Sequence, residues 1–193
     1  MLRQAQGERT WGLHALVRHP DTPSSKVEGV SVQLLSADAS SMMIEFSVRG
    51  RSHVLVPEPA APIRNDGLWK TTCFEAFLQP DHAASYLELN FSPSLAWAAY
   101  SFAEYRAGMS DIEPRFAPEI WLSQSDPDLD YLFLSAEFDV ADALNGPFRL
   151  GLSAVIEEVD GTKSYWALAH PPGAPDFHHP DCFALHIPAL GSP

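Results

Sequence analysis

Two neighbouring segments in the middle of the chain carry carboxylate and amide side chains at the spacing of β-strands. Glu75 lies within residues 72–78, while Glu88 and Asn90 lie within residues 85–92, and apolar residues alternate with all three. Because successive side chains of a strand point to opposite faces, these three polar groups share one face of a sheet. Neighbouring carboxyl groups can share a proton, hold a cation or hydrogen-bond a polar ligand. This polar face is the first candidate for a functional site.

The register of the two segments decides which groups meet. A hairpin that closes symmetrically about residues 79–84 places Glu75 directly opposite Glu88. Like charges directly opposite each other destabilise a sheet. We therefore expect compensation by Arg64 or Arg106, by a bound cation, by a shared proton or by a ligand.

A third segment, residues 97–105, extends the same sheet beyond residues 85–92. Its alternation predicts that the core receives Ala98, Tyr100 and Phe102. The polar face then receives Trp97, Ala99, Ser101 and Tyr105, with Asn90 between Cys73 and Trp97. A register shift by one residue would turn the apolar residues out of the core, whereas a shift by two would not.

An aromatic and polar surface over small residues suits a polyhydroxylated ligand. The rings of Tyr86 and Trp97 can cover apolar C–H patches of a sugar, while carboxylates, an amide and an arginine share hydrogen bonds with its hydroxyls. We therefore expect a small, sugar-like ligand. The alternative is a solvated outer sheet face with an ordinary Arg–Glu network, because any antiparallel sheet places polar residues outward.

A histidine-rich segment, residues 170–181, follows near the C-terminus. It contains His170, Asp176, His178, His179 and Asp181. Imidazole and carboxylate are metal ligands, but prolines keep this backbone extended and adjacent histidines then point in different directions. We expect these groups to hydrogen-bond backbone in an ordered loop, with ligand contact and metal binding as alternatives.

Catalysis and cofactor binding are weaker interpretations of the same residues. Glu75 and Glu88 could act as the carboxylate pair of a glycosidase, whose members lie roughly 5–9 Å apart. The chain has neither a nucleophile elbow nor a glycine-rich phosphate loop, so we expect no catalytic residue. No cofactor is expected either. Calcium remains an alternative, as does haem with Met109, His170 or His178 as axial ligand.

The elements that position these groups are short strands. Period-2 runs cover residues 30–34, 42–48, 72–78, 85–92, 97–105, 131–138, 148–156, 164–169 and 183–187, and proline clusters separate several of them. Asp160-Gly161 predicts a hairpin turn at residues 159–162, and only residues 140–144 look helical. The pattern predicts an all-β, two-sheet antiparallel β-sandwich with little helix, as one domain over residues 1–193.

The charge composition disfavours some classes of binding partner. The chain has 12 Lys and Arg against 25 Asp and Glu, a formal charge of −13. Such a surface repels phosphate backbones and anionic lipids, so neither nucleic acid nor a membrane is an expected partner. The first 17 residues contain no apolar leader, and the two cysteines suit a reducing compartment, so we expect a cytoplasmic protein.

Three sequence segments resemble the DOMON-like superfamily, in particular the branch related to family 9 carbohydrate-binding modules. The first is DGLWKTTCFEAFL at residues 66–78, and the second is YLELNFSP at residues 86–93 followed by WAAY at residues 97–100. The third is HHPDCF at residues 178–183. Together they span roughly residues 26–190. The resemblance implies a β-sandwich that binds sugars or, in other branches, haem. It also implies a pair of sugar-clamping tryptophans, for which the candidates are Trp69, Trp97, Trp121 and Trp166.

The sequence thus predicts a non-catalytic domain that binds a sugar or sugar derivative through a polar and aromatic sheet face. The expected ligand-binding residues are Arg64, Trp69, Glu75, Tyr86, Glu88, Asn90, Trp97, Trp166, His170 and His178. The alternative is a protein-interaction module that uses the same face for a protein partner or a second copy of the chain. A flat apolar patch around Trp97 and Trp121 would favour that alternative over a concave pocket.

Overall fold

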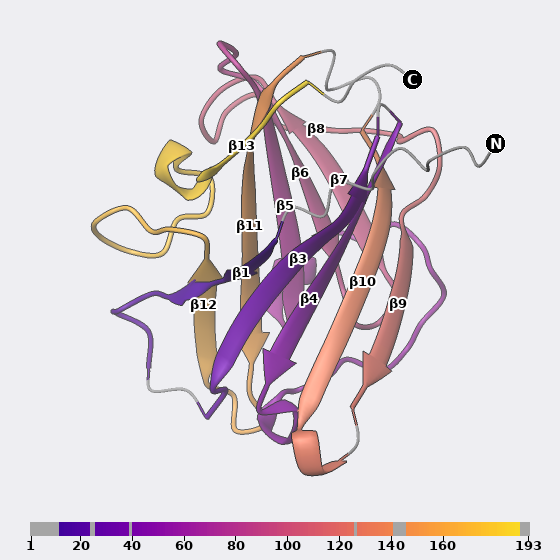
Figure 1. The fold of residues 1–193 in the computed structure, drawn as a ribbon, viewed down its shortest axis with the longest axis vertical. Coiled ribbons are helices and arrows are strands. Elements are labelled where there is room, and N and C mark those ends of the chain that lie inside the picture. Colours follow the sequence, from indigo (N-terminus) through magenta and orange to yellow (C-terminus); the bar gives the residue numbers. More distant parts are fainter. Residues whose placement is uncertain (1–11, 24–25, 39, 126, 141–145, 190–193) are drawn as a thin grey trace, which may run out of the picture.

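The computed structural model describes residues 12–23, 26–38, 40–125, 127–140 and 146–189. Two antiparallel sheets pack face to face in it (Figure 1). This confirms the predicted all-β sandwich. The helical turn expected at residues 140–144 lies almost wholly outside the described residues.

In the part of the chain that the structure describes, the first sheet has five strands. Their order across the sheet is β1 (Leu13–Ala15), β3 (Gly29–Ala37), β4 (Ser41–Arg49), β10 (Tyr131–Asp139) and β9 (Glu119–Gln124). It forms the front layer of Figure 1.

The second sheet has eight strands within the described residues and contains Glu75, Glu88 and Asn90. Its order is β2 (Val17–Arg18), β12 (Lys163–Ala167), β11 (Phe148–Glu157), β5 (Cys73–Pro80), β6 (Tyr86–Phe91), β7 (Trp97–Phe102) and β8 (Ser110–Asp111), while β13 (Leu185–Ile187) pairs with the first residues of β11.

The helical elements of the described chain are single 3₁₀ turns. They are η1 (Arg51–His53), η2 (Leu68–Lys70), η3 (Pro127–Leu129) and η4 (Pro180–Cys182). Within the described residues, no helix has the length and apolar character needed to cross a membrane.

The main core lies between the two sheets and follows the predicted alternation. Met42, Ile44, Phe46 and Val48 of β4 are all fully buried, and the ring of Phe46 lies 4.9 Å from that of Phe74 on β5. The Asp-Gly turn is also confirmed. Glu158 N–H donates to Thr162 O at 2.8 Å, and Gly161 has a φ of 86°, a conformation that glycine adopts without strain. Four strands were not predicted: β1, β2 and β8 are too short to show a pattern, and β9 is largely exposed.

A second apolar layer covers the outer face of the eight-stranded sheet. It includes Phe77, Tyr86, Tyr100 and Phe102 from the sheet, with Phe177, Cys182 and Phe183 from the C-terminal part of the chain. The central strands are therefore buried on both faces, and only part of the outer face remains open.

The structure corrects the predicted register between β5 and β6. Glu75 faces Asn90, and Glu88 faces Phe77, so the two glutamates are diagonal neighbours and not directly opposed. The actual pairing differs from the expected one by two residues, which leaves every side chain on its predicted face.

The structure also corrects the orientation of β7. Trp97 pairs with Phe91 and Tyr100 pairs with Glu88, so Tyr100, with Ala98 and Phe102, lies on the polar face, and Trp97 lies on the side of the main core. The connection after β6 decides this: Ser92 N–H donates to Ala96 O at 2.9 Å, and Leu95 adopts a φ of 73°. Both faces of β7 are buried, so its alternation carries no contrast from which the sequence could indicate the right face.

Candidate functional site

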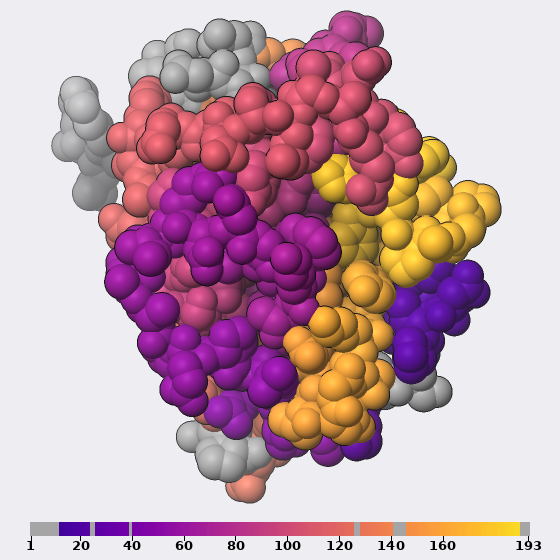
Figure 2. Space-filling view, turned by 180° about the vertical axis from the view of Figure 1, so that it is seen from behind, coloured from indigo at the N-terminus to yellow at the C-terminus, as the bar shows by residue number. Residues whose placement is uncertain are grey.

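A pocket of about 790 Å³ opens on the outer face of the eight-stranded sheet. Figure 2 looks at this side of the molecule, where segments near residues 50–70, 100–115 and 155–187 surround a hollow. The sheet supplies the floor, with Glu75, Glu88, Tyr100, Phe102 and Val155. One wall comes from residues 66–70, and the other from Tyr165 and residues 175–178.

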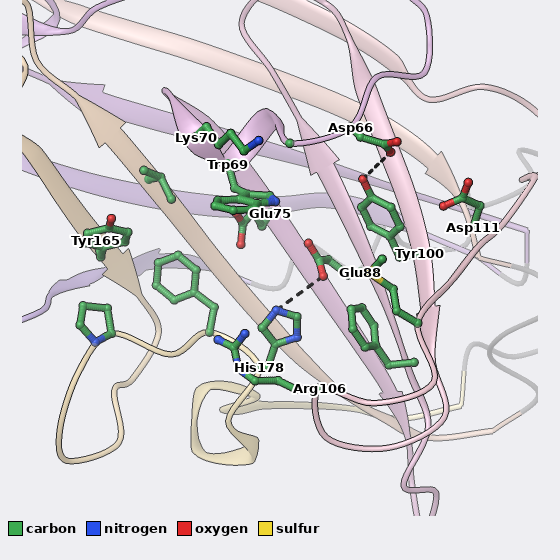
Figure 3. Close-up of a pocket in the computed structure, with 16 residues that line it drawn as sticks. Asp66, Trp69, Lys70, Glu75, Glu88, Tyr100, Arg106, Asp111, Tyr165 and His178 are labelled. Atoms are coloured by element: carbon green, nitrogen blue, oxygen red, sulfur yellow. Dashed lines mark hydrogen bonds and ion pairs between the residues drawn. The ribbon is translucent and has the colours of Figure 1, made fainter.

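The two glutamates lie on the floor side by side on neighbouring strands (Figure 3). Glu75 is 3% exposed and Glu88 is 5% exposed. Ser153 Oγ donates to Glu75 Oε2 at 3.3 Å, and Asn90 Nδ2 donates to Glu88 Oε1 at 2.7 Å. These short polar side chains orient the carboxyl groups without neutralising them.

Burial raises the pKa of both carboxyl groups, because it disfavours the charged form. The pKa of Glu75 lies well above its ordinary value, first through burial and then through repulsion by Glu88. The pKa of Glu88 is also raised by burial, against the opposing effects of the Asn90 hydrogen bond and of Arg106. The pair can therefore hold a proton in the pH range where free glutamates are ionised, and a protonated carboxyl both donates and accepts hydrogen bonds.

A hydrogen-bonded chain leads from the turn after β7 to His178, whose ring lies beside Glu88. Arg106 N–H donates to Tyr86 Oη at 3.2 Å, and Tyr86 Oη lies 2.8 Å from His178 Nδ1. Since the Tyr86 hydroxyl has one proton to give, we assign it to Nδ1, which leaves the His178 proton on Nε2, 3.7 Å from Glu88 Oε2. Burial lowers the pKa of His178 to about 4, so the ring is neutral at pH 7.

Asp176 ties the second wall to the same turn. It accepts hydrogen bonds from Tyr105 Oη, from Arg106 Nη2 at 2.6 Å and from the His178 backbone N–H at 3.2 Å. Tyr105 and Arg106 lie beyond the end of β7, far from Asp176 in sequence. This cluster therefore holds residues 176–178 against the sheet.

The first wall is held by the edge of β7. Trp97 N–H donates to Ile63 O, and Asn65 N–H donates to Trp97 O, so residues 63–65 run alongside the strand. Arg64 then pairs with Asp66 at 2.9 Å and with Asp111 at 2.6 Å. The Tyr100 hydroxyl donates to Asp66 Oδ1 at 2.7 Å.

Trp69 stands at the mouth of the pocket on η2. The residue is 51% exposed, and the Lys70 ammonium lies 5.6 Å from the centre of its ring. Gly67, with a φ of 71°, begins this turn in a conformation that favours glycine. A half-exposed tryptophan beside a pocket is available to contact a ligand.

The structure brings together most of the residues expected to bind a ligand. Trp69, Glu75, Glu88 and His178 line the pocket. Tyr86, Asn90 and Arg64 contact lining residues through the bonds described above.

Three expected residues lie elsewhere, which corrects their predicted placement. Trp97 is buried on the core side of β7. Trp166 packs in the main core, where its Nε1 donates to Ser164 Oγ at 2.9 Å. His170 Nε2 lies 2.8 Å from Val17 O, and its ring packs 4.8 Å from that of His19.

Several pocket residues were not predicted as ligand contacts. They are Asp66, Lys70, Tyr100, Phe102, Arg106, Met109, Asp111, Tyr165 and Phe177. Tyr100 and Phe102 were assigned to the wrong face of β7. Phe177 lies between the proline cluster at residues 171–175 and the histidines at residues 178–179. An apolar residue in such a polar loop indicates a side chain that is buried against the rest of the protein.

Metal and protein-partner interpretations gain no geometric support from these residues. No group of three or more His, Cys, Asp or Glu side chains in the described part of the chain is arranged to hold a metal ion. His178 turns to Tyr86, whereas His179 Nδ1 accepts from the backbone of Asp181. Trp121 is 44% exposed on β9 of the other sheet, so it forms no patch with Trp97.

Comparisons with known proteins support the fold. No protein-family model matches the sequence, and no curated protein matches it. A solved structure described as a "putative carbohydrate-binding protein" from Bacteroides uniformis is similar, with a TM-score of 0.65 and 13% identity over 89% of this chain and 83% of that one. A family 9 carbohydrate-binding module from Caldicellulosiruptor kristjanssonii, in complex with cellotriose, has a TM-score of 0.53 and 11% identity over 84% of this chain and 74% of that one. The chain therefore shares its β-sandwich fold with proteins described as carbohydrate-binding.

Proposed function

We propose that this protein binds a saccharide or saccharide derivative in the pocket on its eight-stranded sheet. The observation that carries the proposal is the pairing of buried carboxyl groups with aromatic side chains around one pocket. Glu75 and Glu88 offer hydrogen bonds to hydroxyls, while Trp69 and Tyr100 offer ring surfaces to C–H groups. The fold shared with carbohydrate-binding proteins, and the proposed relation to the DOMON-like superfamily, support it.

The pocket dimensions agree with this proposal. Its volume of about 790 Å³ lies within the range of roughly 300–1,000 Å³ that is typical of small-molecule sites. Its lining combines apolar rings with a few convergent polar groups, the composition that gives such sites both affinity and orientation.

Tryptophan fluorescence tests the proposal directly. We expect a saturable change when the protein is titrated with one class in a panel of mono- and oligosaccharides. Replacing Trp69 with Phe should remove most of that change, because Trp69 lines the pocket. The matched control is Trp121→Phe, which alters a tryptophan of similar exposure on the other sheet and should leave the ligand-induced change intact. A flat response to every saccharide would overturn the proposal.

A carboxylate-pair hydrolase is the second candidate function. The raised pKa of Glu75 favours it, because a general acid must keep its proton near neutral pH. Hydrolysis also requires the partner carboxylate to reach the other side of the reacting carbon. We place binding first because Glu75 and Glu88 stand on adjacent strands of one floor. Turnover of aryl glycosides by the wild type that disappears in Glu75→Gln would reverse this order.

A further inference from the structure

The floor of the pocket carries two carboxyl groups without a cationic partner. Among the described residues, no Lys or Arg nitrogen lies within 4.0 Å of Glu75 or Glu88. The basic nitrogen that does lie within this range is His178 Nε2, 3.7 Å from Glu88 Oε2, and that ring is neutral at pH 7. The hydrogen bond from Ser153, at 3.3 Å, is the one that the described residues give to the Glu75 carboxyl. Glu75, which is 3% exposed, thus faces the pocket with one carboxyl oxygen free for a ligand.

The arginines around the pocket are engaged elsewhere. Arg64 pairs with both Asp66 and Asp111, and Arg106 pairs with Asp176. Asp66 and Asp111 line the pocket on the side of Tyr100 (Figure 3). Asp176 belongs to the wall segment 175–178 and pairs with Arg106. The arginines therefore pair with these aspartates and leave the two glutamates of the floor uncompensated. Arg106 reaches the glutamates only through a longer-range Coulomb interaction.

The aromatic side chains of the pocket already attract cations. The Arg64 guanidinium lies 5.3 Å from the centre of the Tyr100 ring, and the Lys70 ammonium lies 5.6 Å from that of Trp69. Both distances fall within the roughly 6 Å at which a ring face attracts a positive charge. A ligand cation on the floor would meet ring surfaces of the same kind together with two carboxyl groups.

We infer that the saccharide bound in this pocket carries a protonated amino group, which is held between Glu75 and Glu88. This inference rests on the proposed saccharide-binding function and specifies the class of sugar. An ammonium group supplies the charge that the buried pair lacks, because an unpaired buried charge is costly and a paired one is much less so. Sugars with carboxylate or phosphate groups are disfavoured by the same floor.

Binding of such a ligand should change the protonation of Glu75 and Glu88 in a predictable direction. A cation next to the pair stabilises the ionised carboxylates and lowers their pKa. The complex therefore releases protons that the free protein holds on the glutamates. Affinity for the amine should rise with pH while the glutamates deprotonate, and fall again once the amine loses its own proton.

Three sugars that differ only at the second carbon provide the test. We would measure binding of glucosamine, glucose and N-acetylglucosamine at pH 6 by calorimetry, with cyclohexylamine as a ring-sized amine that lacks hydroxyls. We expect glucosamine to bind at least ~10-fold more tightly than either neutral sugar, which corresponds to about 1.4 kcal/mol. Two buffers of different ionisation enthalpy should reveal proton release with glucosamine and none with glucose.

Two matched substitutions separate a local ion pair from the overall negative charge. Glu88→Gln and Glu45→Gln remove the same formal charge, but Glu45 lies on the outer face of the five-stranded sheet, where Ser135 Oγ donates to it at 2.9 Å. Glu88→Gln should abolish the preference for glucosamine, and Glu45→Gln should retain it. If Glu88→Gln fails to fold, the proton release of the wild type still decides.

The outcomes distinguish this inference from the proposed function. Equal binding of all three sugars, or tighter binding of glucose, overturns the inference and leaves saccharide binding intact. If cyclohexylamine binds in a glutamate-dependent manner and none of the three sugars binds, the saccharide function is overturned and amine recognition is supported. Absence of binding by all four compounds overturns the inference, and the panel of mono- and oligosaccharides then decides the saccharide function by itself.

Discussion

The ring of Phe183 lies directly against the backbone of Gly151 on β11. A Cβ atom at Gly151 would meet the ring at 2.6 Å, closer than atoms can approach without rearrangement. The missing side chain lets the C-terminal segment pack on the outer face of the sheet, next to Phe77, whose ring centre lies 5.6 Å from that of Phe183. This contact positions the chain that leads back to His178 and thus one wall of the pocket.

Replacing Gly151 with Ala should therefore destabilise the protein and weaken ligand binding. Overpacking a filled site lowers the free energy of unfolding by about 1–3 kcal/mol, so we expect the Tm of this variant to fall. Thermal unfolding followed by circular dichroism measures it. The control is Gly29→Ala on β3, where a new Cβ meets nothing within 4 Å, and its Tm should stay unchanged or rise slightly. Equal effects of the two substitutions would argue against the packing role of Gly151.

Replacing Glu75 with Gln should stabilise the protein at neutral pH. The folded-state pKa of Glu75 lies above its unfolded value, so the native state binds more protons and loses stability as pH rises through that range. Glutamine stays neutral and removes this loss. We expect the gain in Tm to be larger at pH 7 than at pH 4. A destabilised variant at pH 7 would mean that the carboxylate is compensated in the folded protein.

His178 should affect the free energy of unfolding in the opposite sense to Glu75, because its effect is a loss of stability as pH falls. Burial lowers its folded-state pKa to about 4, below the unfolded value near 6.5. The unfolded state then binds more protons between these values, and stability is lost as pH falls from about 6.5 to 4. The full effect is on the order of 3 kcal/mol. His178→Gln should flatten the pH dependence of the free energy of unfolding in this window, measured by urea denaturation at several pH values. An unchanged pH profile would show that another group dominates it.

Asp176 should be necessary for the shape of the pocket. Replacing it with Asn removes the acceptor charge shared by Tyr105, Arg106 and the His178 backbone. Hydrogen bonds to a charged group contribute about 1.5–3 kcal/mol, so both Tm and ligand affinity should fall. The control is Asp160→Asn, which breaks the solvent-exposed pair with Lys26 away from the pocket and should leave binding unchanged. An Asp176→Asn variant that binds normally would show that the position of this wall does not depend on the Asp176 carboxylate.

Both cysteines should be inert in the folded protein. Cys73 and Cys182 are buried free thiols, and burial raises their pKa, in the case of Cys182 to about 12. A thiol must ionise and be reached by the reagent to react. Ellman's reagent at pH 8 should therefore detect neither thiol in the native protein and both after denaturation. Rapid labelling of the native protein would show that the outer apolar layer opens.

The strands could be predicted from the sequence because the alternation of side chains is a local pattern. Alternation on β4, β5 and β6 reflects one face packed in the main core and another face of different character, so period-2 analysis placed Phe74, Glu75 and Glu88 on their correct faces. The Asp-Gly turn was predicted for a similar reason, since the requirement for positive φ acts within two residues. Burial on both sides removed this contrast at β7, and the prediction of its faces was wrong.

The amino-acid sequence by itself determined the acidic surface, the two-sheet β architecture and the presence of Glu75, Glu88 and Asn90 on one sheet face. Tertiary structure decided which of these groups meet, because a pairing shift of two residues leaves the alternating pattern unchanged and only the closing turn selects the register. It also decided that residues 63–70, the turn around Arg106 and residues 175–178 surround the glutamates as a pocket. Those contacts join parts of the chain that are far apart in sequence. No local pattern encodes them, since they depend on the complete packing of the outer apolar layer.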